Sequence, residues 1–227
     1  MAVTYDIIVQ GNNLSLRDGF LGLANVTLVH SSGGHFLFDT GHYVNRSLLL
    51  DGLARHGVDP AEVKTVFLSH LHFDHSLNID LFPRAAVYVS RAEWDYAAAP
   101  NPKDLFIPWM IREKLEEYDL KLIEGEGSLC KGIRYFPTPG HTPGSYSLVL
   151  ETEAGPSVLA GDAVKYVKEI LTGVSDMPFG TVEDSKKSIR RVTDLAERIV
   201  PGHFQELVKR KGRFVWDEGA ECDLVIR

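Results

Sequence analysis

The chain has little cysteine, no strongly basic segment and no long apolar run. Its two cysteines, Cys130 and Cys222, lie far apart, and neither has a partner at metal-ligand spacing. We therefore expect two free thiols, as in a reducing compartment. The longest basic run is Lys209-Arg210-Lys211, and the formal net charge is −7. The basic footprint of a protein that binds nucleic acid is therefore missing.

No apolar run of the chain reaches the ~18 residues that a membrane span needs. The N-terminal residues also lack the charged-then-apolar pattern of a signal peptide, so we expect a cytoplasmic protein without a membrane partner. The length of 227 residues suits one large domain. Because no Ser/Gly linker, low-complexity segment or internal repeat divides the chain, we expect a single domain over residues 1–227.

The apolar segments predict strands first and then strands that alternate with helices. Residues 3–9 alternate between apolar and polar side chains, as in a half-buried strand. Two apolar runs, residues 26–30 and 35–39, flank turn-forming residues and predict a hairpin. Further strands are expected at residues 66–68, 86–90, 120–123, 133–138, 145–150, 157–160, 214–216 and 222–226.

Three segments have helical patterns. Residues 45–56 place Leu49, Leu50 and Leu53 inward, and Gly57 follows as a stop signal. Residues 111–118 form a shorter helical stretch, and a capping box at residues 181–184 opens the clearest helix. The apolar face of that helix is expected to carry Ile189, Val192, Leu195, Ala196 and Ile199.

The most informative feature is a group of four polar residues that directly follows the strand predicted at residues 66–68. His70, His72, Asp74 and His75 place three imidazoles and one carboxylate within six positions. In a packed core these groups would compete for the same few hydrogen-bond partners. A metal ion satisfies them together, because imidazole nitrogen and carboxylate oxygen are good ligands for zinc and iron.

Three more residues of metal-binding type follow predicted strands. His141, Asp162 and His203 each come directly after a glycine, which lets the backbone turn sharply beside an ion. With the first cluster they make a set of five histidines and two aspartates. One metal takes about four ligands. The set therefore predicts two metals that share a ligand, ~3.5–4 Å apart as in other two-metal sites.

In this order and spacing, the motifs His-x-His-x-Asp-His, Gly-His-Thr-Pro-Gly, Gly-Asp and Gly-His resemble those of the metallo-β-lactamase fold superfamily. The resemblance runs from Asp39-Thr40-Gly41 to His203 and so covers most of the chain. It implies an α+β fold, a four-layer αβ/βα sandwich in which two mixed β-sheets lie face to face between helices. The metals would lie in a cleft at one edge of the sheets.

The resemblance also implies a role for each residue of these motifs. The first metal would be held by His70, His72 and His141, and the second by Asp74, His75 and His203. Asp162 would bridge the two ions, and Asp39 would orient a ligand histidine. We expect two zinc ions, with iron or manganese as alternatives. His30, His35, His42 and His56 have no matching role.

The expected reaction is hydrolysis, in which a metal-bridged hydroxide attacks a lactone, ester or thioester carbonyl of a small molecule. Asp74 and Asp162 would move the proton of that hydroxide. Residues 138–144 and 161–163 resemble the N-acyl-homoserine lactonases and the small MBLAC-type proteins. Where those lactonases have a tyrosine, three residues after the bridging aspartate, this chain has Lys165 followed by Tyr166. We expect both to lie beside the substrate.

Other activities of the fold stay open at this stage. A mononuclear iron oxygenase of the persulfide dioxygenase type would use only one metal. A phosphodiesterase or nuclease would use two, although nucleases of the fold carry an added domain or an RNA-binding arm that this length does not accommodate. A zinc-binding domain without catalysis is the third alternative, which the complete ligand set disfavours.

Aromatic residues supply the candidate walls of a substrate pocket. Phe20, between the first predicted strands, and Trp109 are expected to contact the substrate. The segment 91–120 contains several aromatic residues and could form a lid, a dimer contact or part of the core, so a homodimer stays open as well. The segment also carries Trp94, Tyr96, Phe106 and Met110.

Overall fold

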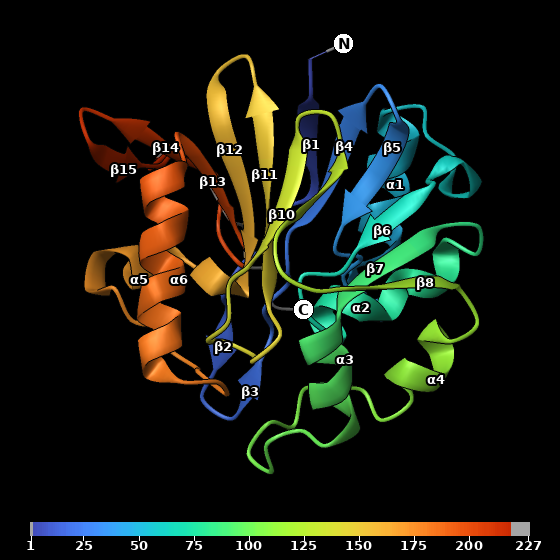
Figure 1. Cartoon of the computed structure of the whole chain (residues 1–227), viewed down its shortest axis with the longest axis horizontal. Helices are drawn as coiled ribbons and strands as arrows, with labels where there is room; N and C mark the ends of the chain where they lie inside the picture. The colour runs from blue at the N-terminus through green and yellow to red at the C-terminus, as the bar shows by residue number, and fades with distance from the viewer. Residues whose placement is uncertain (1, 219–227) are drawn as a thin grey trace.

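Two β-sheets lie face to face at the centre of the molecule (Figure 1). The computed structural model describes residues 2–218. In the first sheet, β1, β4 and β5 pair in antiparallel fashion, and the strands from β5 to β8 pair in parallel, so the sheet is mixed. Its six strands are, in spatial order, β1 (Thr4–Val9), β4 (Val26–Ser31), β5 (Gly34–Phe38), β6 (Thr65–Phe67), β7 (Ala86–Ser90) and β8 (Asp119–Ile123).

The second sheet is also mixed. Only β12 and β13 pair in parallel among its described neighbours, and the other pairs are antiparallel. Its seven strands are, in spatial order, β15 (Arg213–Val215), β14 (Leu207–Arg210), β13 (Arg198–Pro201), β12 (Gly155–Gly161), β11 (Tyr146–Thr152), β10 (Ile133–Pro137) and β9 (Gly127–Cys130). A small hairpin of β2 (Ser15–Leu16) and β3 (Gly19–Phe20) forms a sheet of its own.

Helices cover the outer faces of both sheets (Figure 1). They are α1 (Arg46–Arg55), α2 (Phe73–Ser76), α3 (Arg91–Ala98), α4 (Ile111–Leu115), α5 (Val167–Thr172) and α6 (Val182–Leu195). Short 3₁₀ turns occur at η1 (Tyr43–Asn45), η2 (Pro60–Glu62), η3 (Leu77–Leu81) and η4 (Asp162–Val164). Within the described part of the chain, no helix has the length and apolar character to cross a membrane.

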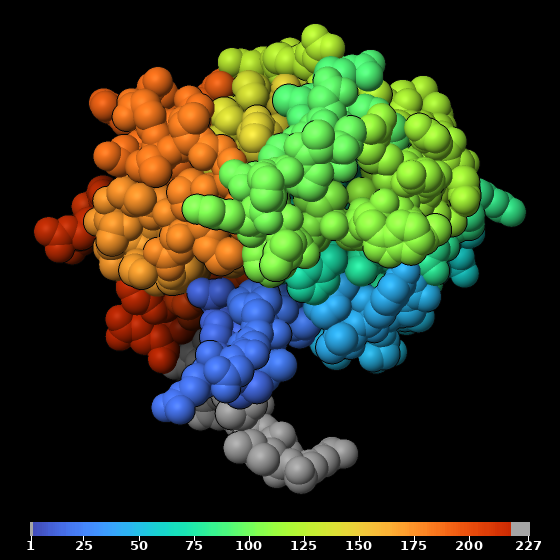
Figure 2. All heavy atoms as spheres, turned by 90° about the horizontal axis from the view of Figure 1, so that it is seen from below, coloured from blue at the N-terminus to red at the C-terminus, as the bar shows by residue number. Residues whose placement is uncertain are grey.

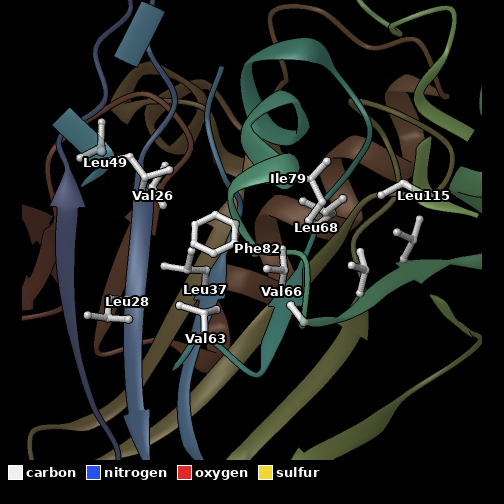
Figure 3. Close-up of a cluster of buried hydrophobic side chains, with 14 of the residues drawn as sticks. Val26, Leu28, Leu37, Leu49, Val63, Val66, Leu68, Ile79, Phe82 and Leu115 are labelled. Carbon is white, nitrogen blue, oxygen red and sulfur yellow. The ribbon is translucent and has the colours of Figure 1, made fainter. Parts of the chain in front are cut away.

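The alternation of side chains along the strands divides the core into layers. In the first sheet, Leu28 and Leu37 pack toward α1 and its neighbours, where they are fully buried (Figure 3). Their neighbours Val29 and Phe36 point the other way and pack between the two sheets. Full burial of one such side chain stabilises the fold by about 1.5–3 kcal/mol. A third cluster lies between the second sheet and α6.

The order of layers is therefore helix, sheet, sheet, helix, and the expected α+β sandwich is confirmed. The strands predicted within residues 3–160 are all present, with bounds that differ by at most two residues. The helix predicted from a capping box is present as well, and the Thr181 side chain accepts a hydrogen bond from the backbone N–H of Asp184. Cys130 forms no disulfide within the described residues, whereas Cys222 and the strand predicted at residues 222–226 lie outside them.

Four details of the predicted helices are wrong. Leu195, expected on the apolar face of the helix that follows the capping box, is 37% exposed at the end of α6. Leu50 is 37% exposed, because it lies about 100° around the helix from Leu49, whose side chain is buried. The helix predicted at residues 111–118 ends earlier, as α4 (Ile111–Leu115). Ile199 belongs to β13 instead of α6: Ala196 already has extended backbone angles, and Ile199 pairs with Val158 of β12.

Candidate metal centre

The predicted ligands come together at one edge of the two sheets, where strands end. β6 leads into the cluster of residues 70–75, and β10, β12 and β13 run in the same direction and lead to His141, Asp162 and His203. All seven side chains are buried, with at most 6% exposed surface. Parallel strands end at the same edge, so residues from distant parts of the sequence meet there.

The seven residues form two groups around Asp162. Ligand atoms of His70, His72 and His141 lie within 4.8 Å of one another, and so do those of the group Asp74, His75 and His203. One carboxylate oxygen of Asp162 is 3.3 Å from Nε2 of His141, in the first group. The other is 3.3 Å from Nε2 of His75 and 3.4 Å from Nε2 of His203, in the second group. Asp162 thus lies between the groups, in the place that the resemblance implies for a bridging ligand.

The outer ring nitrogen of each histidine is held by a hydrogen bond. His141 donates from Nδ1 to the carbonyl of Met177 over 3.0 Å, and His203 donates from Nδ1 to the carbonyl of Asn12 over 3.2 Å. His72 instead donates from Nε2 to Asp104, also over 3.0 Å. Such bonds fix the tautomer and leave the other nitrogen, with its lone pair, facing inward.

Asp39 and Ser69 hold the two remaining histidines. Asp39 accepts hydrogen bonds from Nδ1 of His75 (2.8 Å) and from the backbone N–H (2.7 Å) and hydroxyl (2.8 Å) of Ser69. Because the Ser69 hydroxyl donates to Asp39, it accepts from Nδ1 of His70, 3.0 Å away. Asp39 itself has φ of +62°, a conformation that residues other than glycine rarely adopt. The backbone is therefore strained at Asp39, directly after the end of β5, where this carboxylate is positioned.

The inward-facing atoms fit metal ions. With the tautomers fixed as above, Nδ1 of His72 and Nε2 of His141 both present lone pairs, yet they lie only 3.0 Å apart. Nε2 of His70, His75 and His203 and one oxygen of Asp162 are buried without a hydrogen-bond partner. Buried acceptors that face one another are unfavourable unless a cation lies among them.

The pKa shifts differ between the two groups. Burial lowers the pKa of His70 well below its usual value and that of His141 to about 3, so both rings are neutral. Burial also lowers the pKa of His75 and His203, but the charge of Asp162 outweighs it and raises both, so each of these rings holds a proton that a metal ion would displace. Burial raises the pKa of Asp162, but the charges of Lys165, His203 and His75 outweigh it and hold the pKa well below its usual range. Neutral imidazoles and ionised carboxylates are the forms that bind metals.

Three carboxylates that the sequence did not single out support the centre. Asp104 accepts from His72 and also from the hydroxyl of Tyr96, at 2.7 Å. Glu93 is buried and accepts hydrogen bonds from the backbone of Leu71 and the hydroxyl of Thr142, so it ties the two ligand loops together. Each is a single acidic residue far along the chain from the cluster, and no local pattern distinguishes it.

The third supporting carboxylate, Glu169 of α5, holds the loop after Asp162. It accepts hydrogen bonds from the backbone N–H groups of Lys165 and Asp176, and burial raises its pKa to about 7. The Lys165 ammonium group itself lies 3.2 Å from Asp162 and packs over the ring of Phe20. The charge of Asp162 outweighs the effect of burial and raises the pKa of Lys165, so the group stays cationic.

A cavity of about 250 Å³ opens beside the centre. The β2–β3 hairpin forms one side of it, and Figure 2 shows this blue segment next to the orange and green parts of the surface. The residues that line the cavity are Ser15, Phe20, His72, Phe73, Asp74, Phe106, His141, Lys165 and Met177. The structure therefore brings Phe20 and Lys165 to the cavity.

The structure does not bring every expected pocket residue to this cavity. Trp109 is 88% exposed and lines a separate hollow with Tyr43 and Met110. Trp94 of α3 is buried in the core on the outer face of the first sheet, where the guanidinium group of Arg112 lies over its ring. Tyr166 follows Lys165 but is not among the lining residues of the 250 Å³ cavity. Of the aromatic segment, only Phe106 lines that cavity.

Comparisons with known proteins agree with this description. Residues 19–203 match the family described as the metallo-beta-lactamase superfamily. An N-acyl homoserine lactonase from a Bacillus species is 34% identical over 171 residues, which cover 73% of this chain and 65% of the lactonase. The mouse metallo-beta-lactamase domain-containing protein 1 is 32% identical over 186 residues, covering 80% of this chain and 64% of that protein. The matched region thus spans less than two thirds of either relative.

The fold is also similar to a solved structure of known activity. A crystal structure of a quorum-quenching N-acyl homoserine lactone lactonase superposes with a TM-score of 0.70 and 25% sequence identity. The superposition covers 90% of this chain and 93% of that one.

Proposed function

This chain belongs to the metallo-β-lactamase superfamily, and on that premise we propose that it hydrolyses a lactone, ester or thioester of a small molecule with the help of two divalent metal ions. The observation that carries the proposal is the 3.0 Å approach of two inward-facing nitrogens, on His72 and His141, whose outer nitrogens are both committed to hydrogen bonds. A cation between them removes the repulsion.

The seven buried residues divide naturally between two ions. His70, His72 and His141 would hold one, and Asp74, His75 and His203 the other, with Asp162 shared between them. Imidazole and carboxylate together favour zinc, and iron or manganese are the alternatives. When bound, two such ions supply Lewis acidity toward a carbonyl oxygen and lower the pKa of a water that they share.

The chain's own residues would position the substrate and move the proton. Asp74 lines the cavity, and the charges of His75 and His203 outweigh the effect of burial and hold its pKa low, so it is an ionised acceptor. It would take the proton of the attacking water and return it to the leaving oxygen or sulfur. The Lys165 ammonium group has donors to spare after its contact with Asp162, and these would stabilise negative charge on the carbonyl oxygen.

The walls of the cavity favour a small substrate with an apolar part. Phe20, Phe106 and Met177 provide apolar surface beside the polar residues Asp74 and Lys165. A relative and a structural neighbour are named N-acyl homoserine lactonases, which supports a lactone with an acyl chain as the first substrate to try. Lys165 in place of the lactonase tyrosine supports a broader class that includes esters and thioesters.

The test combines metal analysis of the purified protein with a hydrolysis panel of an N-acyl homoserine lactone, a thioester and a phosphodiester. We expect about two ions per chain and turnover of the lactone or the thioester. One iron per chain with oxygen uptake and no hydrolysis would instead identify an oxygenase. A fully metal-loaded protein that turns over none of these substrates would contradict the proposed hydrolysis.

A further inference from the structure

A second group of histidines lies on the outer face of the first sheet, away from the metal centre. Strand register explains the group: His30 of β4 is directly opposite His35 of β5, and Asp6 of β1 is the diagonal neighbour of His30. These side chains share the face that carries Leu28 and is covered by α1. Helix α1 ends at Arg55, and its C-cap residue His56 extends over the polar end of this face. We name Asp6, His30, His35 and His56 the outer histidine cluster.

The atoms of the outer histidine cluster are already close. Nε2 of His30 is 3.1 Å and Nδ1 of His56 is 3.5 Å from the same carboxylate oxygen of Asp6. One ligand atom from each of these three residues falls within 4.8 Å of the others. The side chains are 47% exposed for Asp6, 25% for His30 and 31% for His56, so an ion could enter from solvent.

We infer that Asp6, His30 and His56 form a binding site for a further divalent transition-metal ion, with zinc as the best fit. Two imidazoles and one carboxylate are ligands that zinc uses, and three protein ligands leave a fourth position for water. The residues come from β1, β4 and the end of α1, so their positions depend on tertiary structure and not on a local sequence motif. The inference does not depend on the proposed hydrolysis.

His35 completes the site without binding the ion. Its Nδ1 lies 2.9 Å from Nδ1 of His30, so one of these two nitrogens carries the proton that they share. When Nε2 of His30 binds a cation, its Nδ1 carries the proton and donates it to His35. A ligand histidine that donates its second N–H to a fixed acceptor binds metal better, commonly by about 10–100-fold. His35 is therefore a positioning residue.

An ion at this site would join three elements. β1 is the edge strand of the first sheet, and α1 lies across its outer face. The ion would fasten the edge strand to the end of the helix from outside the apolar core. Because only the folded chain brings the three ligands together, binding would stabilise the folded state.

The experiment counts zinc ions per chain by competition with a chromophoric chelator, using the full chain with its metal centre loaded. We expect wild type to bind one ion more than the variants His30→Asn and His56→Asn. Asp6→Asn should lower the affinity for that additional ion at least about tenfold, and His35→Gln should lower it about 10–100-fold. Asp51→Asn is the matched control, because Asp51 is an exposed carboxylate on α1 outside the cluster.

The same variants separate this site from the metal centre. Hydrolytic turnover and the first ions should be unchanged in all of them, because the outer histidine cluster shares no residue with the centre. Equal zinc binding by wild type and His30→Asn would overturn the inference, as would a loss in Asp51→Asn equal to the loss in Asp6→Asn. Failure of the hydrolysis panel alone would leave the additional zinc ion in place.

Discussion

The two histidine clusters of this molecule use the same residue types under opposite conditions of burial. In the metal centre, at the sheet edge, every candidate ligand side chain is at most 6% exposed, and each histidine has its outer nitrogen fixed by a partner. In the outer histidine cluster the side chains are a quarter to a half exposed, and water can replace any lost partner. Each buried side chain of the metal centre therefore depends on its protein partner, whereas each exposed side chain of the outer histidine cluster does not.

The difference concerns what remains after a ligand is lost. A buried charge without a partner destabilises the folded state strongly, because neither solvent nor protein compensates for it. An exposed charge loses little, because the median exposed ion pair contributes only about 0–1 kcal/mol. Substitutions in the metal centre should therefore affect folding, metal binding and turnover together, whereas those in the outer histidine cluster should affect metal binding, and stability only through the bound ion.

The largest effect is expected from Asp162→Ala, which removes the residue between the two groups. Turnover and metal retention should both be abolished. The variant should also lose about 3–5 kcal/mol of unfolding free energy, because Lys165 is left buried without its partner. Metal analysis, steady-state kinetics and urea unfolding measure the three effects. Asp51→Ala is the exposed control, and an Asp162→Ala protein with full activity and no metal would refute the scheme.

Lys165→Met tests whether the cavity lysine contributes to the reaction and not only to the fold. Loss of one donor to a developing negative charge typically lowers kcat about 10²–10³-fold. We expect a fall of that size with the metal content retained, because Lys165 is not among the predicted ligands. The matched control is Lys168→Met, since Lys168 is exposed and pairs with Asp176. An unchanged kcat would assign Lys165 a structural role alone.

Asp104→Asn should have a smaller effect on the same centre. The substitution weakens the acceptor for Nε2 of His72 and should lower metal affinity about 10–100-fold while leaving the fold intact. Chelator competition gives the affinity, and Asp95→Asn, on the exposed side of α3, serves as the control. Equal affinities for Asp104→Asn and wild type would show that this hydrogen bond does not orient the ring.

The smallest effect is expected from His56→Asn in metal-free protein. The unfolding free energy should change by no more than about 0.5 kcal/mol, as for most surface substitutions. Urea unfolding of wild type and variant, side by side, measures the change. A loss of several kcal/mol would break the comparison, because it would show that the outer histidine cluster is as indispensable to the fold as the buried residues are.

Sequence patterns predicted those parts of the site that are local. His70, His72, Asp74 and His75 are almost contiguous, and the other three candidate ligands each follow a glycine at a strand end, so all seven could be picked out and the structure brings them together. Their role as ligands stays a prediction. The alternation of apolar side chains predicted the strands, whereas the sandwich fold was implied by the resemblance to the metallo-β-lactamase superfamily and is confirmed.

Parts that depend on tertiary contacts were not predictable. Glu93 accepts hydrogen bonds from Leu71 and Thr142, which are 22 and 49 residues away along the chain, and Asp104 accepts one from His72, which is 32 residues away. The residues next to Glu93 and Asp104 in the sequence form no pattern that points to these contacts. Trp109 was expected at the substrate because aromatic residues favour pockets, but the fold turns it outward. Ile199 continued the helical period by coincidence, since a buried strand also requires an apolar residue at that position.

The β2–β3 hairpin has a consequence for how this scaffold can be altered. It contributes Ser15 and Phe20 to the cavity, but its strands pair with each other and not with either main sheet. The backbone bridge between Asn12 and Leu23 closes its base, and the carbonyl of Asn12 holds His203. Residues 13–22 can therefore be exchanged as a cassette above that base. Libraries that keep Phe20, whose ring contacts His203 and Lys165, and vary the rest of this cassette should change the cavity wall while leaving the seven buried candidate ligands in place.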